Sequence, residues 1–368
     1  MNGKQFYLKP NIVIEPLYDR WYAWAHLISP ATAAMNVTNR HLKIMNSYIQ
    51  SPQIHQMAVK NPKMLGGPFM DYDGVRLDDI KALRESTLEK QADLIAFSAA
   101  VKELDEMLRS KANGGSLEPL YELVPDILKG YVELVYDLNN NPAYRFFEPL
   151  LYSSEFYKKE SQSIALSITN NDERPFCLST PRINEEGVLH LNIPFDHEGI
   201  DELCKMKRTA GSVDEIAGKL GIQPEDRALF DTFFTEQSHP TYRKYEGDKA
   251  RMRYFGHACI LLETNEVSVL IDPLVSYYGY DSTVDHFSDI DLPDTIDYVL
   301  ITHNHQDHIL LETLIPLRHK VKNIIVPRSC TGALQDPNLK LTLNSVGFNN
   351  VIEIDDMEQI NFQNCTIT

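Results

Sequence analysis

The sequence has no uninterrupted apolar run that approaches the ~18 residues a membrane-spanning helix needs. Its N-terminal stretch, MNGKQFYLKP, lacks the apolar segment that signal peptides carry. Cysteine is scarce too: there are five, and no two of them form a CxxC pair. These absences predict a reduced, cytoplasmic protein without membrane spans and without structural zinc–cysteine sites.

Positive charge is also in short supply. Lys and Arg total 35 against 52 Asp and Glu, a formal net charge of −17. Proteins that bind nucleic acid through its phosphates need a basic face, so this balance argues against such a partner. The 368 residues, 43% of them hydrophobic, can still bury a sizeable core, and the length predicts two or three domains.

Residues 1–240 are predicted to form an α+β, mostly helical N-terminal domain. The aromatic stretch around Trp21, Tyr22 and Trp24 is expected to be irregular or a short helix, serving as core or as a partner surface. Apolar residues at helical spacing predict one long helix over Asp78–Ser110, whose apolar face packs in the core or in a dimer interface. The remaining predicted elements are helices at Thr38–Ile49 with Thr38 as N-cap, after Ser116 as far as Asn139, and at Glu155–Thr169, Gly199–Lys207, Val213–Leu220 and Glu225–Phe234, with a hairpin of Phe176–Ser179 and Val188–Pro194.

A polar stretch, Gln237–Ala250, separates this region from a different pattern, and we place the linker at 241–251. From residue 252 onward strands alternate with helices, which is typical of an α/β layered domain. The predicted elements are a strand pair of Met252–Glu263 and Val267–Ile271, a buried strand Tyr298–Ile301, a helix Leu310–Leu317 and a strand Lys322–Val326.

The run that carries chemistry is Thr302-His303-Asn304-His305-Gln306-Asp307-His308. It places three imidazoles and a carboxylate directly after a buried strand, where α/β sheets usually hold their sites. Imidazole and carboxylate are ligands for zinc, iron and other divalent metals. Side chains alternate along a strand, so an extended strand end would point His303 and His305 the same way, and a following turn would move Asp307 and His308 to a second position. The sequence therefore predicts a site for two metals.

This signature, together with FGHACILLE and VLIDP upstream of it, resembles the metallo-β-lactamase superfold. The resemblance covers residues 252–368 and implies an αββα sandwich that binds one or two metals. It does not fix the reaction, because the superfold hosts hydrolases, nucleases and oxygenases.

The N-terminal text EPLYDRWYAWAHLISPATAAMN and the later LGGPF resemble a narrower group, the diiron β-hydroxylases of chloramphenicol biosynthesis and other nonribosomal peptide assembly. The resemblance implies two iron ions, O₂ as co-substrate and an external electron donor. It implies hydroxylation of the β-carbon of an aminoacyl group held as a thioester on a phosphopantetheinylated carrier domain. It further implies that the N-terminal domain serves homodimerisation and carrier docking.

Carried over residue by residue, the resemblance assigns His303 and His305 to the first metal and Asp307 and His308 to the second. Asp272 and Thr302 are expected to orient ligand imidazoles, although Asp272 could instead cap a turn. His257 is expected near the metals or, equally, in the core. Asp196-His197-Glu198 is expected to begin a helix rather than to bind metal.

The family's other ligands, a bridging carboxylate, an additional ligand of the first metal and a distal His, cannot be assigned. No histidine follows His319, and the segment Asn361–Thr368 reads as an unfinished strand, so we expect a truncated metal domain. Alternatively, Glu353, Asp355, Asp356 or Glu358 could complete the site in a shortened fold.

Two other functions remain open from the sequence. A dinuclear zinc hydrolase acting on an ester, lactone, amide or phosphodiester fits the four ligands equally well. It would have a His as additional first-metal ligand where the β-hydroxylase has a Glu, an oxygen donor that favours iron. A non-enzymatic docking and dimerisation module would bind no metal, which the intact ligand run argues against.

Overall fold

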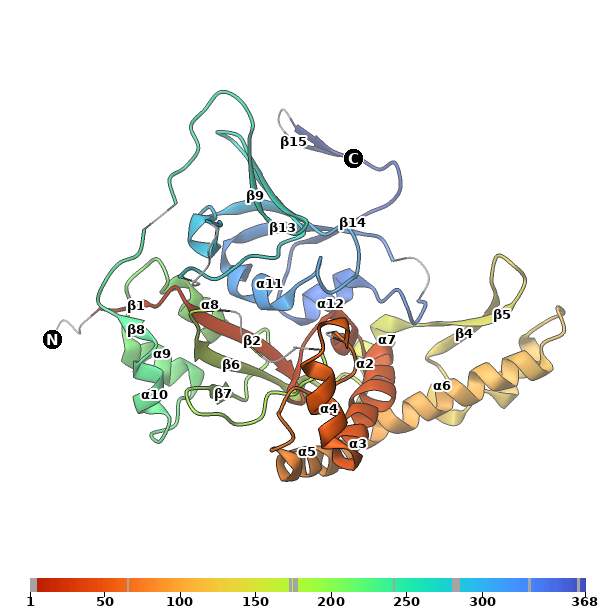
Figure 1. Ribbon diagram of the computed structural model, residues 1–368. Helices are drawn as coiled ribbons and strands as arrows, with labels where there is room; N and C mark the ends of the chain where they lie inside the picture. The colour runs from red at the N-terminus through yellow and green to blue at the C-terminus, as the bar shows by residue number, and fades with distance from the viewer. Residues whose placement is uncertain are drawn as a thin grey trace.

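The computed structural model describes residues 5–64, 66–171, 174, 178–240, 242–279, 285–329, 332–362 and 365–368. A four-stranded sheet organises the first part of the chain and a six-stranded sheet the second (Figure 1). No helix in the described residues is both long and apolar enough to cross a bilayer.

The four-stranded sheet is antiparallel, in the order β3 (Trp21–Tyr22), β2 (Ile12–Tyr18), β6 (Gln162–Ile168) and β7 (Leu189–Leu191). Every residue of β2 is buried. The aromatic stretch thus contains a strand, β3, rather than only irregular or helical structure.

Two predictions about this sheet were wrong. The segment predicted as a helix over Glu155–Thr169 forms β6, because pairing with β2, far away in the sequence, overrides an apolar run that local pattern leaves ambiguous. The predicted strand Val188–Pro194 contains β7, which pairs with β6. Of its predicted hairpin partner, Leu178 and Ser179 lie in a turn and not in a strand, while Phe176 and Cys177 lie outside the described residues.

The helices that follow β3 in the chain pack against one another. They are α1 (Ala25–Ile28), α2 (Pro30–Asn36), α3 (Leu42–Gln50), α4 (Pro52–Val59), α5 (Leu77–Lys90) and α6 (Ala92–Lys111), with a π-helical turn at Val37–His41 and a 3₁₀ turn at Pro62–Met64. Thr38 is not an N-cap, because it lies in the π-helical turn that joins α2 directly to α3.

The predicted long helix Asp78–Ser110 is divided at Gln91, whose backbone leaves the helical region with φ −109° and ψ 21°. The break points the Gln91 side chain into the core, where it donates to Ser161 Oγ at 2.7 Å and accepts from Tyr18 Oη at 3.4 Å. The apolar face of α6 packs inside this same chain, as the burial of Phe97 and Leu104 shows. The core interpretation of that face is confirmed.

The stretch after Ser116 was predicted as a helix and instead forms two 3₁₀ turns and a hairpin. The elements are 3₁₀ turns at Glu118–Leu123 and Asp126–Leu128, then β4 (Val132–Tyr136) and β5 (Pro142–Phe146). Asn140, with φ 61°, allows the turn between the strands. This hairpin and α6 lie side by side and project from the body (Figure 1).

Shorter elements complete the first part. They are α7 (Glu148–Tyr152), a 3₁₀ turn at Lys159–Ser161, α8 (Glu198–Lys205), α9 (Val213–Leu220), α10 (Arg227–Asp231), and β1 (Tyr7–Leu8) paired with β8 (Phe234–Thr235). The three predicted short helices are therefore confirmed. Residues 236–240 and 242–250 contain no helix or strand.

The six-stranded sheet has the order β14-β13-β12-β11-β10-β9, antiparallel from β9 to β11 and parallel from β11 to β14. Its strands are β9 (Arg251–Gly256), β10 (Cys259–Glu263), β11 (Ser268–Ile271), β12 (Ile296–Leu300), β13 (Val321–Pro327) and β14 (Val351–Ile354). The other elements here are α11 (Leu311–Leu317), α12 (Leu339–Ser345), 3₁₀ turns at Asp289–Asp291 and Arg318–Lys320, and the hairpin of β15 (Ile360–Phe362) and β16 (Cys365–Ile367).

The predicted strand Met252–Glu263 is two strands. The chain reverses between Gly256, with φ 109°, and His257, with φ 48°, and folds β10 back onto β9. Glycine adopts positive φ without strain, so Gly256 permits the reversal. The turn carries His257 out of the sheet.

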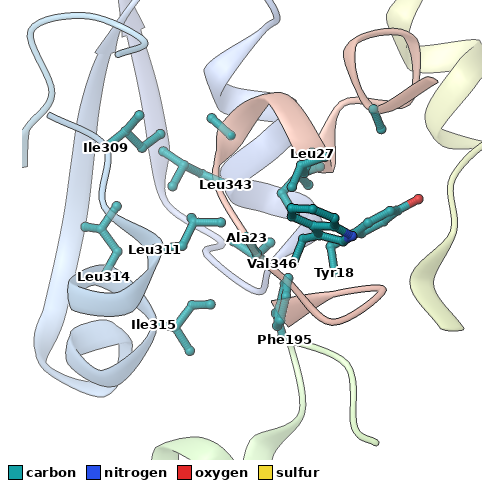
Figure 2. Close-up of a cluster of buried hydrophobic side chains, with 14 of the residues drawn as sticks. Tyr18, Ala23, Leu27, Phe195, Ile309, Leu311, Leu314, Ile315, Leu343 and Val346 are labelled. Atoms are coloured by element: carbon teal, nitrogen blue, oxygen red, sulfur yellow. The ribbon is translucent and has the colours of Figure 1, made fainter. Parts of the chain in front are cut away.

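The two parts of the chain share one core. Leu311, Leu314 and Ile315 of α11 are fully buried. Figure 2 shows them beside Ala23, Leu27 and Phe195 of the first part, with Leu343 and Val346 from the α12 region. Helix α11 is therefore held against the first part of the chain, where it contacts β2 and α8.

Candidate metal centre

The histidine run forms the loop between β12 and α11. Strand β12 ends at Leu300 in the middle of the parallel strands, and α11 begins at Leu311. We call residues 302–310 the metal loop. Polar side chains thus gather at the carboxyl end of a central parallel strand, as the sequence predicted.

The metal loop is bent rather than extended. The backbone amides of His308 and Ile309 both donate to the His305 carbonyl, at 3.0 and 3.1 Å, which closes a turn. The prediction of an extended strand end was therefore wrong, although its consequence holds: the His303 and His305 rings lie 4.5 Å apart between centroids. The His303 and His308 rings are 4.0 Å apart. Bends in the loop, not strand alternation, bring the imidazoles together.

Asp307 joins the imidazoles from the other side. Its Oδ2 lies 3.8 Å from His308 Nε2 and 2.9 Å from His257 Nε2. His257, Asp307 and His308 offer ligand atoms that all lie within 4.8 Å of one another. The turn between β9 and β10 thus places His257 at the site, and not in the core.

Asp272 holds the metal loop in place through hydrogen bonds to Thr302 and His308. It follows β11, and its Oδ1 accepts from the Thr302 backbone amide at 2.8 Å. Its Oδ2 accepts from the Thr302 hydroxyl at 2.7 Å and from His308 Nδ1 at 2.8 Å. A histidine that donates from Nδ1 to a carboxylate presents the lone pair of Nε2 to a metal.

Thr302 acts on His303 in the same way. Because its hydroxyl donates to Asp272, it accepts from His303 Nδ1, 3.0 Å away. Partial burial, with the neighbouring His308 and His305 rings, lowers the pKa of His303 and favours the neutral, ligating ring. The Nε2 atoms of His303 and His308 are thereby left for a ligand. The chemistry of these side chains fits a metal site. Of the four predicted ligands, Asp307 and His308 stand with His257 in the cluster found among the described residues, and His303 and His305 lie outside that cluster.

The first part of the chain borders this loop through residues that the sequence analysis missed. His26 lies against the Asn304 backbone, and burial lowers its pKa. Trp24 stacks on His26 with 4.6 Å between ring centroids. Asn304 Nδ2 also donates to Asp336 Oδ1 at 3.0 Å. No local pattern links these distant residues to the motif.

Several other candidates lie elsewhere. Asp355 and Glu358 pair with Arg328, at 3.0 and 3.5 Å, and Glu353 accepts from Asn338. None of them, nor Asp356, joins the metal-type group found among the described residues. His197 is the N-cap of α8, accepting from the Gly199 amide at 3.0 Å, as predicted.

Comparison with known proteins places the chain. Residues 7–238 match the family described as the diiron non-haem β-hydroxylase N-terminal domain, and residues 251–367 match the β-lactamase superfamily domain. Over 363 residues the chain is 35% identical to the 4-amino-L-phenylalanyl-[CmlP-peptidyl-carrier-protein] 3-hydroxylase of Streptomyces venezuelae, covering 97% of this chain and 68% of that one. A match of 44% over 55 residues, 15% of this chain and 21% of the relative, links it to a UPF0173 protein of Pyrococcus abyssi.

The fold agrees with that relationship. It is similar to the crystal structure of CmlA, a diiron β-hydroxylase from Streptomyces venezuelae, with a TM-score of 0.88 and 34% identity over 99% of this chain and 69% of that one. A point variant of CmlA gives the same TM-score. The expected architecture, a largely helical N-terminal domain followed by a β-lactamase-type domain, is confirmed, and so is the preference for two irons over two zincs. The chain belongs to the diiron non-haem β-hydroxylases.

Proposed function

We propose that this protein uses O₂ and two iron ions to hydroxylate the β-carbon of an aromatic aminoacyl group tethered to a carrier domain. The observation that carries the proposal is the imidazole and carboxylate cluster of the metal loop. A relative that aligns with 97% of this chain acts on a 4-amino-L-phenylalanyl group on a peptidyl carrier protein.

In this proposal His303 and His305 hold the first iron, and Asp307 and His308 hold the second. The irons, when bound, supply the activation of O₂ that attack on an unreactive C–H bond requires. The chain supplies orientation: Asp272 holds His308 through Nδ1, and Thr302 holds His303.

His257 has a separate role. Its Nε2 lies 2.9 Å from Asp307 Oδ2, and its backbone stands at a positive φ of 48°. A non-glycine residue in that region is uncommon, and such conformations concentrate at functional sites. We assign His257 to hold the Asp307 carboxylate in the direction of the second iron.

The same proposal includes the partners of the protein and its location in the cell. We propose that residues 1–240 form the domain for carrier docking and homodimerisation, that residues 241–251 link it to the metal domain, and that an external donor supplies electrons. We place the protein in the cytoplasm, where nonribosomal peptide assembly takes place and where its scattered cysteines would stay reduced.

The test begins with the protein purified without added metal. Element-resolved analysis and an optical spectrum should give two irons per chain and charge-transfer absorption. The protein, reduced and mixed with ¹⁸O₂ and an aromatic aminoacyl carrier, should add one labelled oxygen atom to the aminoacyl group by mass spectrometry. Zinc at the same stoichiometry, with a featureless spectrum and no labelled product, would refute the proposal.

A further inference from the structure

We propose that Glu312 is a positioning residue for this reaction. Its carboxylate joins the helix that follows the metal loop to the N-terminal part of the chain, and so fixes where the metal ligands stand relative to a substrate presented from that part. The inference deepens the proposed function and rests on it for the substrate, but not for the metal loop itself.

Glu312 lies in the first turn of α11, four residues after His308. It is only 7% exposed. Its Oε2 accepts from Tyr22 Oη at 2.8 Å, and its Oε1 accepts from Tyr277 Oη at 2.9 Å and from Arg174 Nη1 at 2.8 Å. An acidic side chain that merely complemented the helix dipole would stand in water at the surface. This one is buried and holds three donors from three distant segments.

Two of these donors anchor Glu312 to the N-terminal sheet. Tyr22 belongs to β3. Tyr277 donates to Glu312 and also accepts from the Ile14 backbone amide of β2, at 3.3 Å. The carboxylate is thus hydrogen-bonded to Tyr22 of β3 and, through Tyr277, to β2. These are neighbouring strands of one sheet.

Glu15 pairs with Arg174, the third donor, and with Arg182. Arg174 Nη1 lies 3.5 Å from Glu15 Oε1, and Arg182 grips Glu15 with two bonds of 2.9 Å. Glu15 and Glu312 thus share Arg174, and Glu15 also pairs with Arg182. Buried ion pairs of this kind seldom add stability over apolar packing, and their better-supported use is to specify one arrangement.

Glu312 is connected to the metal ligands through contacts between two segments of the chain. Residues 272–277 and 302–313 are joined at three points: Asp272 holds Thr302 and His308, the Val275 amide donates to Thr313 Oγ1 at 3.3 Å, and Tyr277 holds Glu312. Leu311, Leu314 and Ile315 of α11 pack in the core (Figure 2). A shift of Glu312 would consequently move the metal loop as a unit.

The experiment compares tyrosine-to-phenylalanine variants that each remove one phenol oxygen. Tyr22→Phe and Tyr277→Phe release Glu312. Tyr157→Phe is the matched control, because Tyr157 also reaches from the first part of the chain to the second, but donates to the carbonyl of Ser345, the last residue of α12, at 3.1 Å. Glu312→Gln is the severe variant, since it removes the negative charge that lies 2.8 Å from Arg174 Nη1.

Three readouts are needed beside the melting temperature. The first is hydrogen exchange of the amides of residues 302–313 in metal-free protein. The second is the optical spectrum of the iron-loaded protein, and the third is the hydroxylated product formed per O₂ consumed. We expect Tyr22→Phe and Tyr277→Phe to speed exchange in the metal loop, shift the spectrum and lower the product yield per O₂ by roughly tenfold, because small misplacements of reacting groups are costly. Tyr157→Phe should leave all three unchanged.

The inference is overturned if both variants match Tyr157→Phe in exchange and spectrum, whatever Glu312→Gln does to the melting temperature. A wild-type protein that forms no hydroxylated product would defeat the proposed function instead. Exchange and spectrum would then still decide whether Glu312 positions the metal loop.

Discussion

Asp272 Oδ2 lies 2.8 Å from His308 Nδ1, and this contact ties the end of one central strand to a ligand that follows its neighbour. Asp272 itself has a positive φ of 41°. Asparagine tolerates that backbone nearly as well as aspartate, so Asp272→Asn removes the charge without imposing strain.

We expect Asp272→Asn to weaken metal affinity about 10- to 100-fold, because an amide polarises the His308 ring less and orients it less firmly. Competition against a chelator measures the change. Asp297→Asn is the matched control: Asp297 accepts from the Ser268 amide at 2.9 Å, at the opposite end of the same strands. Equal losses in the two variants would mean that Asp272 only supports the fold.

The double variant His303→Ala, His305→Ala should lose iron and hydroxylation while keeping its far-ultraviolet circular dichroism, since both residues lie in a loop and His305 is exposed. Metal analysis and the carrier assay provide the test. His239→Ala, which removes a ring bound to the Leu8 carbonyl at 3.2 Å, should retain its iron. Full iron occupancy in the double variant would move the site elsewhere.

Removal of iron should destabilise the protein. A ligand present at a hundred times its dissociation constant stabilises the folded state by about 2.7 kcal/mol. Chelator treatment should therefore lower the urea midpoint of the wild type and leave the double variant unaffected. A midpoint that ignores the chelator in both proteins would contradict metal binding at the folded loop.

Glu148 gives a prediction for pH. Burial raises its pKa from 4.5 to about 7, although the Asn338 amide donates to it and opposes the shift. A carboxyl group whose folded pKa exceeds its unfolded value resists ionising in the fold. Its contribution to stability is therefore complete below pH 4.5 and is lost as pH rises toward 7, by up to about 3 kcal/mol.

Glu148→Gln should accordingly gain stability relative to the wild type between pH 4.5 and 7.5, as measured by urea unfolding. The comparison with the wild type matters because His41, whose pKa burial lowers to about 3, acts in the opposite direction and destabilises the fold as pH falls below 6.5. Glu118→Gln, on an exposed 3₁₀ turn, should show no such difference. A pH-independent offset for Glu148→Gln would contradict the assignment.

Arg318 gives a prediction for stability. It is 8% exposed and donates to the carbonyls of Phe195 and Val346, at 2.5 and 2.6 Å, and to Asp201 at 3.0 Å. Lysine keeps the charge but not the planar fork, so Arg318→Lys should cost about 2–3 kcal/mol of unfolding free energy. Arg328→Lys, an exposed surface pair, should cost less than about 1 kcal/mol. Comparable losses would show that the fork geometry is unimportant.

Local signals predicted well where the structure depends on local contacts. The helix Val213–Leu220 matches its prediction, because Ser212 Oγ accepts from the Glu215 amide and Gly221, at φ 67°, ends the helix. The predicted strand Tyr298–Ile301 and helix Leu310–Leu317 of the metal domain also match β12 and α11, whose apolar residues are mostly buried. Strand β6 was not, because its partner β2 lies far away in the sequence.

The same division applies to the site. The motif predicted His303, His305, Asp307 and His308, and Asp272 was predicted from its place directly after the strand Val267–Ile271. The neighbours His26 and Asp336 come from segments outside the motif, and the role of Glu312 does not show in the pattern of its own predicted helix. Packing of the two parts of the chain brings His26 to the loop and Tyr22 to Glu312.

The two tryptophans have different surroundings. Trp21 is fully buried and stacks on His41, whose ring stays neutral over the working pH range. Trp24 instead stacks on His26, which touches the metal loop. The intrinsic fluorescence of the protein thus combines a constant core signal with a reporter beside the ligands, so that iron loading can be followed as quenching of Trp24 without any added dye.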